Sequence, residues 1–269
     1  MHDPEEGLDA DGFVVTGARA DRIPTAYRPL VAACVDRLMG DPTLGVSSLY
    51  LYGSVSTGRA VPGRSDLDLI VVGEGAPTPR VADVVRPLAD DRLVREIGVS
   101  TMSWEVVVAD DERGRIERCF LTAYAVHLAG EEVPPTRCRG GRALVRGFAG
   151  ELLERLPRLA AGRLDGADPT GLARRLLMTT AMHLTVERGE WSTDRARAVE
   201  LLRLASTEST ESVPSAPSAV SAAAALFDCV DSRGSRFGAR PSMADIAELA
   251  GWLAESWREA EDATGSSPT

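Results

Sequence analysis

The chain has 269 residues, of which 44% are hydrophobic and 26% charged, and its formal net charge is −10. This balance is typical of a globular protein with one large domain or two ordinary ones, and no apolar run reaches the roughly 18 residues of a membrane-spanning helix. The negative charge argues against a protein that grips long nucleic acid, because phosphate neutralisation requires a basic surface.

The start of the chain and its cysteines suggest a cytoplasmic protein. The first residues, MHDPEEGLDADG, are acidic and lack the basic and apolar segments of a signal peptide. The four cysteines, Cys34, Cys119, Cys138 and Cys229, form no CxxC pair. We expect them to be small buried residues or loop thiols rather than a zinc site or a disulfide framework.

The first half of the chain mixes helical and strand patterns. Apolar residues at helical spacing predict helices at residues 24–39, 80–92 and 115–128. Short apolar or β-branched runs predict strands at residues 49–52, 67–72 and 99–108. These elements predict an N-terminal domain at residues 13–135, with a small mixed sheet and flanking helices.

The second half shows no strand pattern. Its apolar spacing predicts helices at residues 142–161, 169–188, 193–205, 218–231 and 242–262. The segment 206–218, STESTESVPSAPS, is rich in Ser, Thr, Glu and Pro and is expected to be a flexible loop. The fold class predicted for the chain is therefore α+β, with an all-helical C-terminal domain at residues 140–262.

Two aspartates interrupt the apolar strand at 67–72. Asp66 and Asp68 are two residues apart, so in a strand their carboxylates point to the same face. Two carboxylates that lie so close repel each other unless a cation sits between them. Hard divalent cations such as Mg²⁺ take oxygen ligands, so the spacing predicts a magnesium site formed by Asp66 and Asp68.

A Gly-Ser turn follows the strand at 49–52. Gly53 and Ser54 open onto a segment that can begin a helix. Backbone N–H groups and a Ser hydroxyl in such a turn suit a phosphate. A phosphate site beside a magnesium site predicts that the ligand is a nucleoside triphosphate, whose phosphates the metal would neutralise.

A third carboxylate stands in SWEVVV. Glu105 is isolated in an apolar run that we expect to be a strand beside residues 67–72. Its carboxylate could complete the metal site, or it could remove a proton from an attacking hydroxyl. Glu96 is a rival for this role, although it is expected near the end of a helix.

The spacing of these groups resembles a known signature. Gly53-Ser54, eleven residues and then Asp66-Leu67-Asp68 between apolar strands resemble the motif of the nucleotidyltransferase superfamily that includes DNA polymerase β. The two-part layout resembles the aminoglycoside nucleotidyltransferases, notably the streptomycin/spectinomycin adenylyltransferases. Those enzymes have an N-terminal nucleotidyltransferase domain, a helical C-terminal domain, and a strand Glu that serves as base. The motif resemblance covers residues 46–110, and beyond them only the architecture is similar.

The resemblance implies a role for each matching residue. Gly53 and Ser54 would bind the triphosphate of ATP, Asp66 and Asp68 would hold Mg²⁺, and Glu105 would be the base or a third ligand.

One departure from the family pattern concerns a late helix. Such enzymes often carry a Lys near its start, within reach of the nucleotide, whereas residues 189–198 offer only Arg195 and Arg197. Arg195 is therefore a candidate for this nucleotide contact, with the different geometry of a guanidinium.

The resulting hypothesis is a Mg²⁺-dependent transfer of AMP from ATP to a hydroxyl of a small molecule, with an aminoglycoside-type antibiotic as the leading acceptor. No nucleic acid and no membrane are expected as partners. The segment 187–194 contains Glu187, Glu190, Trp191 and Asp194, which suit an amino sugar but also a capped helix start. Two alternatives stay open: an adenylyltransferase that modifies a protein, and a non-catalytic nucleotide-binding module.

Overall fold

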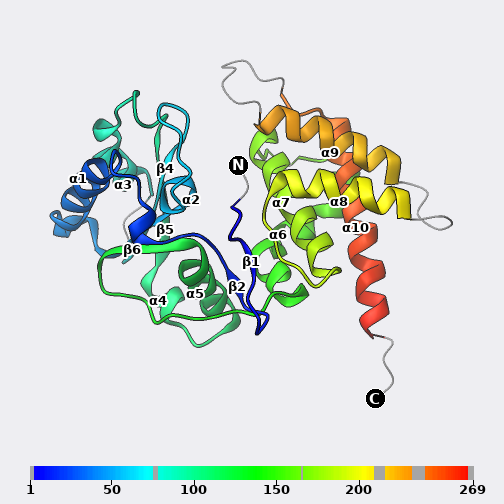
Figure 1. Cartoon of the computed structure of the whole chain (residues 1–269), viewed down its shortest axis with the longest axis horizontal. Helices are drawn as coiled ribbons and strands as arrows, with labels where there is room; N and C mark the ends of the chain where they lie inside the picture. Colours follow the sequence, from blue (N-terminus) through cyan, green and yellow to red (C-terminus); the bar gives the residue numbers. More distant parts are fainter. Residues whose placement is uncertain (1–2, 75–77, 165, 209–215, 232–239, 266–269) are drawn as a thin grey trace. The chain divides into compact units, whose positions relative to one another are not determined.

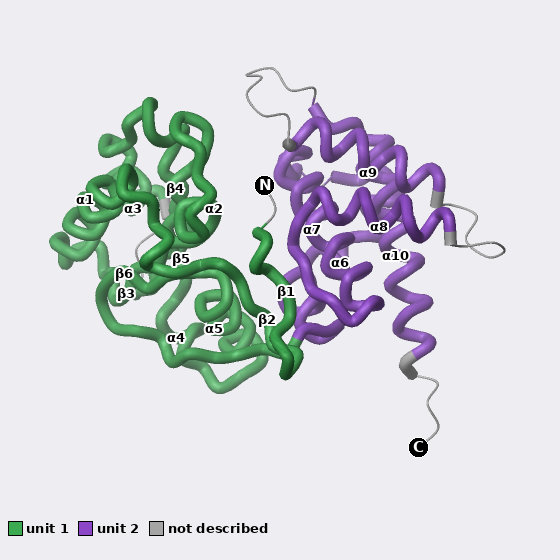
Figure 2. The backbone as a smooth tube through the Cα atoms, viewed as in Figure 1, with its two compact units in different colours: residues 1, 3–139 green, residues 2, 140–269 purple. Residues whose placement is uncertain are grey.

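The computed structural model describes residues 3–74, 78–164, 166–208, 216–231 and 240–265. The chain divides into two compact units, one of residues 3–139 and one that begins at residue 140 (Figure 2). We call them the N-terminal unit and the helical unit, and each is described by itself.

A four-stranded sheet forms the centre of the N-terminal unit (Figure 1). Its strands are β3 (Val46–Tyr52), β4 (Leu67–Gly73), β5 (Ile97–Ser103) and β6 (Ala125–Gly130), in the order β5-β4-β3-β6. β3 runs antiparallel to β4 and β6, whereas β4 and β5 are parallel. The small mixed sheet confirms the fold class predicted for this part of the chain.

Helices cover both faces of this sheet. They are α1 (Arg28–Met39), α2 (Gly53–Ser56), α3 (Thr78–Val85), α4 (Trp104–Val108) and α5 (Glu112–Tyr124), with short 3-10 turns at Ala20–Arg22, Pro42–Leu44 and Arg86–Leu88. Because side chains alternate along a strand, Leu69 of β4 packs with α1 and α3, and Ile70 packs on the other face with α4 and α5. The apolar side chains of β4 are therefore buried on both faces.

The residues before the predicted domain start are also part of this unit. β1 (Gly7–Leu8) and β2 (Val14–Val15) form a separate two-stranded antiparallel sheet. Asp3 is buried and accepts a hydrogen bond of 2.8 Å from the backbone N–H of Gly17. Residues 3–12 are therefore part of the compact N-terminal unit.

The predicted helix at 115–128 is partly wrong. α5 ends at Tyr124, and the next six residues form β6, which pairs with β3. The short run AVHLAG has no clear period, so its sequence alone does not separate the end of a helix from a strand. Antiparallel pairing with β3 makes these residues a strand.

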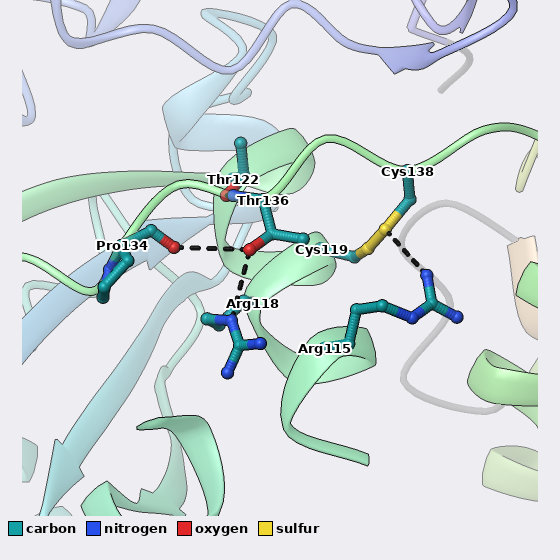
Figure 3. Close-up of a disulfide and its surroundings, with 7 residues drawn as sticks. All are labelled: Arg115, Arg118, Cys119, Thr122, Pro134, Thr136 and Cys138. Atoms are coloured by element: carbon teal, nitrogen blue, oxygen red, sulfur yellow. Dashed lines mark hydrogen bonds between the residues drawn. A yellow bond between two sulfur atoms is a disulfide. The ribbon is translucent and has the colours of Figure 1, made fainter. Parts of the chain in front are cut away.

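The expectation that the cysteines form no disulfide is also wrong. Cys119 on α5 is bonded to Cys138, which lies just before the end of the N-terminal unit (Figure 3). The adjoining chain is held to the same helix, since Thr136 accepts a hydrogen bond of 3.2 Å from Arg118. A separation of 19 residues without a CxxC motif gives no sign of this pairing, because it depends on how the chain returns along α5.

The helical unit contains five helices and no strand among its described residues, as the sequence predicts. They are α6 (Arg142–Ala160), α7 (Pro169–Val186), α8 (Arg195–Glu208), α9 (Ala216–Asp231) and α10 (Met243–Gly265). All five contribute buried side chains to one hydrophobic core. Within the described residues, no helix of the chain has both the length and the apolar character needed to cross a membrane.

The segment predicted as a flexible loop, residues 206–218, is helical at both ends. α8 continues to Glu208 and α9 begins at Ala216. The remaining residues, 209–215, lie outside the described residues.

Candidate functional site

The Gly-Ser turn and the paired aspartates meet at one end of the sheet. Tyr52 at the end of β3 pairs with Asp68 near the start of β4, so the turn that follows Tyr52 lies beside this carboxylate. Gly53 has a φ of +79°, which favours glycine, and a Cβ there would lie 2.7 Å from Oδ2 of Asp68. The absence of a side chain at Gly53 therefore makes room for the Asp68 carboxylate.

A second glycine flanks the same carboxylate. Gly98 of β5 is opposite Asp68 in the parallel register. A Cβ at Gly98 would lie 3.0 Å from Oδ1 of Asp68. The two carboxylate oxygens thus each face a backbone without a side chain, one on β5 and one at the turn after β3.

The surroundings of Asp68 disfavour its ionised form. Burial raises the pKa of this carboxyl to about 6, and the Asp66 and Glu96 carboxylates act in the same direction, against an opposing effect of Arg95. Among the described residues, none donates a hydrogen bond to the Asp68 carboxylate. Because the ionised Asp68 carboxylate is buried near two other carboxylates, an added cation would stabilise it.

Asp66 has a different environment, because it is paired with Arg95. Nε of Arg95 donates to Oδ1 of Asp66 at 2.9 Å, and Nη2 of the same guanidinium donates to Oδ2. Arg95 is in turn held by its backbone, whose N–H donates to the carbonyl of Ser65 at 3.0 Å. The pair is therefore bidentate and fixed by the approach of the two chain segments.

The third carboxylate beside the aspartates is Glu96. The backbone N–H of Leu67 donates to the carbonyl of Glu96 at 3.0 Å, which places Glu96 directly before β5 and next to Asp66. By strand alternation Glu96 lies on the same face as Gly98, the residue opposite Asp68. In REIGVS the apolar residues alternate with polar residues or glycine, and this strand pattern could have indicated that Glu96 belongs to the site. Instead, Glu96 is expected from the sequence near the end of a helix.

Glu105 lies elsewhere, and the strand predicted at 99–108 is wrong in its second half. β5 ends at Ser103, and the residues WEVVV form α4, with Val107 buried. β4 and β5 are parallel, and Ser103 is opposite Gly73, so Glu105 follows the strand end remote from Asp68. Five residues of strand span about 17 Å, so the sheet does not bring Glu105 to the aspartates.

Ser54 and Arg195 occupy separate units. Ser54 is the second residue of α2, directly after Gly53, and its carbonyl accepts a hydrogen bond of 2.8 Å from the backbone N–H of Arg59. Arg195 is the first residue of α8 in the helical unit. Its contact with a nucleotide stays a prediction.

The donor set fits a hard divalent cation in its chemistry. Asp66, Asp68 and Glu96 supply only carboxylate oxygens, the ligands that Mg²⁺ prefers, and the two glycines leave Asp68 accessible to one. Among the described residues, however, no three His, Cys, Asp or Glu side chains converge as a complete metal site. Asp66 is turned to Arg95 instead.

Residues 37–117 match the family described as a nucleotidyltransferase domain. This range contains the Gly-Ser turn, both aspartates and Glu96. The N-terminal unit therefore carries a nucleotidyltransferase domain.

Among solved structures, the chain is similar to that of spectinomycin adenyltransferase AAD(9) from Enterococcus faecialis with ATP and spectinomycin. The two share 13% sequence identity with a TM-score of 0.48, over 85% of this chain and 98% of the other. No curated protein matches the chain at a significant level.

Proposed function

We propose that the chain transfers AMP from ATP to a hydroxyl of a small molecule in a Mg²⁺-dependent reaction. The observation that carries this proposal is the position of Asp68, which lies against the Gly53 turn and beside Asp66. A site that joins a phosphate-binding turn to paired carboxylates suits a metal-bound triphosphate better than any other ligand.

Each residue of the site has a role in the proposed reaction. The backbone at Gly53 and the Ser54 hydroxyl bind phosphate oxygens, and Asp66 and Asp68 hold the metal. When bound, Mg²⁺ neutralises charge on the triphosphate. The acceptor oxygen forms a bond to the α-phosphorus, the bond from that phosphorus to the bridging oxygen breaks, and pyrophosphate leaves.

The proton of the acceptor hydroxyl goes to a carboxylate. We assign this role to Glu96, because it lies beside Asp66 and is mostly exposed, with 67% of its side chain accessible. Glu105, the base expected from the sequence, follows the far end of β5. Arg195 remains our candidate for a further nucleotide contact.

The proposed acceptor is an aminoglycoside-type antibiotic. Its support is the two-part layout, which resembles that of the aminoglycoside nucleotidyltransferases, together with the net charge of −10, which favours a polycationic ligand. The acidic segment 187–194 supports it less than its composition suggests. Glu187 is paired with Arg142 at 2.7 Å and Glu190 with Arg197 at 3.0 Å, while Trp191 is buried beside Phe148.

A labelled-nucleotide screen tests the proposal. The protein is incubated with each nucleoside triphosphate labelled at the α-phosphate, with Mg²⁺ and a panel of aminoglycosides, and the product masses are measured. We expect one acceptor to gain a single adenylate, and the Asp68→Asn variant to give no product. If label appears instead on a purified protein partner, the acceptor class is wrong and the protein-modifying alternative replaces it.

A further inference from the structure

Arg95 is a cation that the chain itself supplies to the acidic site. Its guanidinium makes two hydrogen bonds to Asp66, one to each oxygen. It also lies 3.9 Å from Oε1 of Glu96, and it acts electrostatically on Asp68. Arg95 therefore interacts with all three carboxylates of the site.

The position of Arg95 at Asp66 competes with that of a metal ion. The guanidinium occupies one lone pair on each oxygen of Asp66, and its positive charge repels a second cation at the same carboxylate. This agrees with the lack of a converged three-residue metal site among the described residues. A metal ion should therefore bind Asp66 more tightly once Arg95 has moved away from it.

The Arg95 guanidinium can move because its side chain is open to water. It is 54% exposed, whereas the side chain of Asp66 is 20% exposed. A divalent cation between Asp66 and Asp68 carries twice the charge and interacts with both carboxylates. The pair can therefore yield to a metal without disturbing the strands, whose backbone hydrogen bonds hold Arg95 and Glu96 in place.

We propose that Arg95 is a displaceable counterion: it occupies Asp66 in the nucleotide-free protein and moves to the triphosphate when metal and nucleotide bind. The inference rests on the proposed function, because it assumes that the site binds a metal-bound triphosphate. The released guanidinium remains beside the phosphate-binding turn, since the Gly53 turn lies against Asp68. Arg is well suited to contact phosphate oxygens there.

This role predicts opposite effects of Arg95→Ala on two ligands. Mn²⁺ alone should bind about 10-fold more tightly, because a competing cation is removed. ATP with Mn²⁺ should bind about 10-fold more weakly, because a contact to phosphate is lost. A merely structural ion pair would not shift the two affinities in opposite directions.

Mn²⁺ titration followed by electron paramagnetic resonance measures the first effect, and calorimetry with ATP and Mn²⁺ the second. Arg92→Ala is the matched control, because it removes the same charge from an exposed position three residues away and should change neither affinity appreciably. In an Asp66→Asn background, Arg95→Ala should no longer tighten Mn²⁺ binding.

The possible results separate this inference from the proposed function. If wild-type protein binds ATP with Mn²⁺ but Arg95→Ala leaves the affinity for Mn²⁺ alone unchanged or weaker, the counterion role is wrong and the transfer function stands. If wild-type protein binds neither Mn²⁺ nor ATP with Mn²⁺, both the inference and the proposed function are overturned.

Discussion

For single residues, the most informative feature is Asp68, whose surroundings destabilise its ionised carboxylate when no ligand is bound. Its carboxylate is close to two glycines and two other carboxylates, and the pKa of Asp68 is raised to about 6. Near neutral pH the group is ionised in surroundings that disfavour the charge. The protein without ligand is therefore less stable than it would be with a neutral side chain at this position.

The first prediction concerns the stability of Asp68→Asn in the presence of a chelator. The folded pKa of about 6 lies above the ordinary 3.8, so the folded state binds the proton more tightly and loses stability as the pH rises through 6. About two pKa units correspond to about 3 kcal/mol, so Asp68→Asn should be more stable than wild type by up to about that amount at pH 8. Urea unfolding measures the difference.

The gain should shrink as the pH falls from about 6 to about 4 and be lost below that, because Asp68 is then protonated in both the folded and the unfolded state. Asp110→Asn is the control, since it removes an exposed carboxylate outside the site. A variant at position 68 that is less stable than wild type at pH 8 would contradict this description of the site.

The second prediction compares two glutamates. Glu96→Gln should lower the transfer rate by about 10²–10⁴ while the affinity for ATP with Mg²⁺ changes little, because a base is lost and the nucleotide contacts remain. Glu105→Gln should transfer at nearly the wild-type rate. Single-turnover kinetics and calorimetry on both variants provide the comparison. The reverse ranking would restore Glu105 as the base.

At the scale of elements, the register of β4 and β5 decides which carboxylates meet. The sequence predicts β4 from the apolar run at 67–72, and it predicts the turn from Gly53-Ser54 after the apolar run at 49–52. It does not predict the two ends of β5, since IGVSTMSWEVVV has β-branched residues throughout and no residue that marks a boundary. The parallel pairing with β4 then selects Glu96, and tertiary packing of Val107 makes the following residues helical.

The third prediction tests this register at Gly98. In Gly98→Ala the new Cβ would lie 3.0 Å from Oδ1 of Asp68, so the carboxylate must move by a few tenths of an ångström. We expect kcat to fall about tenfold, because small misplacements at a reacting centre are costly. Thermal stability should change little. Gly150→Ala in α6, where a Cβ meets no atom within 4 Å, should leave kcat unchanged and serves as the control.

The fourth prediction concerns the link between α5 and the chain that follows β6. The Cys119–Cys138 disulfide closes a loop with a separation of 19 residues, for which the loss of unfolded-state entropy amounts to about 3 kcal/mol. Reduction, or Cys119→Ser, should lower the unfolding free energy of the N-terminal unit by about that amount. Denaturant unfolding with and without reductant measures this change.

Cys229, which is outside the Cys119–Cys138 disulfide, provides the control for that experiment. Cys229→Ser should retain the sensitivity to reductant, whereas Cys119→Ser should lose it. An unfolding curve of wild-type protein that is identical with and without reductant would show that the disulfide contributes no stability.

For the whole molecule, the two units differ in how much of their structure the sequence predicts. The family match covers residues 37–117 and thus lies within the N-terminal unit, where the motif spacing predicts the site. In the helical unit, apolar spacing predicts the helices, but the acidic segment 187–194 forms ion pairs with Arg142 and Arg197 that no spacing rule indicates. Such pairs depend on which helices pack together.

We propose that the carboxylates beside the Gly53 turn support nucleotide transfer from ATP to an acceptor hydroxyl. Acceptor-dependent release of pyrophosphate from ATP, measured in wild type and in Asp68→Asn in the same buffer with Mg²⁺, tests it most directly. We expect one pyrophosphate for each modified acceptor in wild type, no release after addition of a chelator, and none from Asp68→Asn. Release of pyrophosphate from Asp68→Asn at the wild-type rate, or release of inorganic phosphate instead of pyrophosphate by wild type, would contradict it.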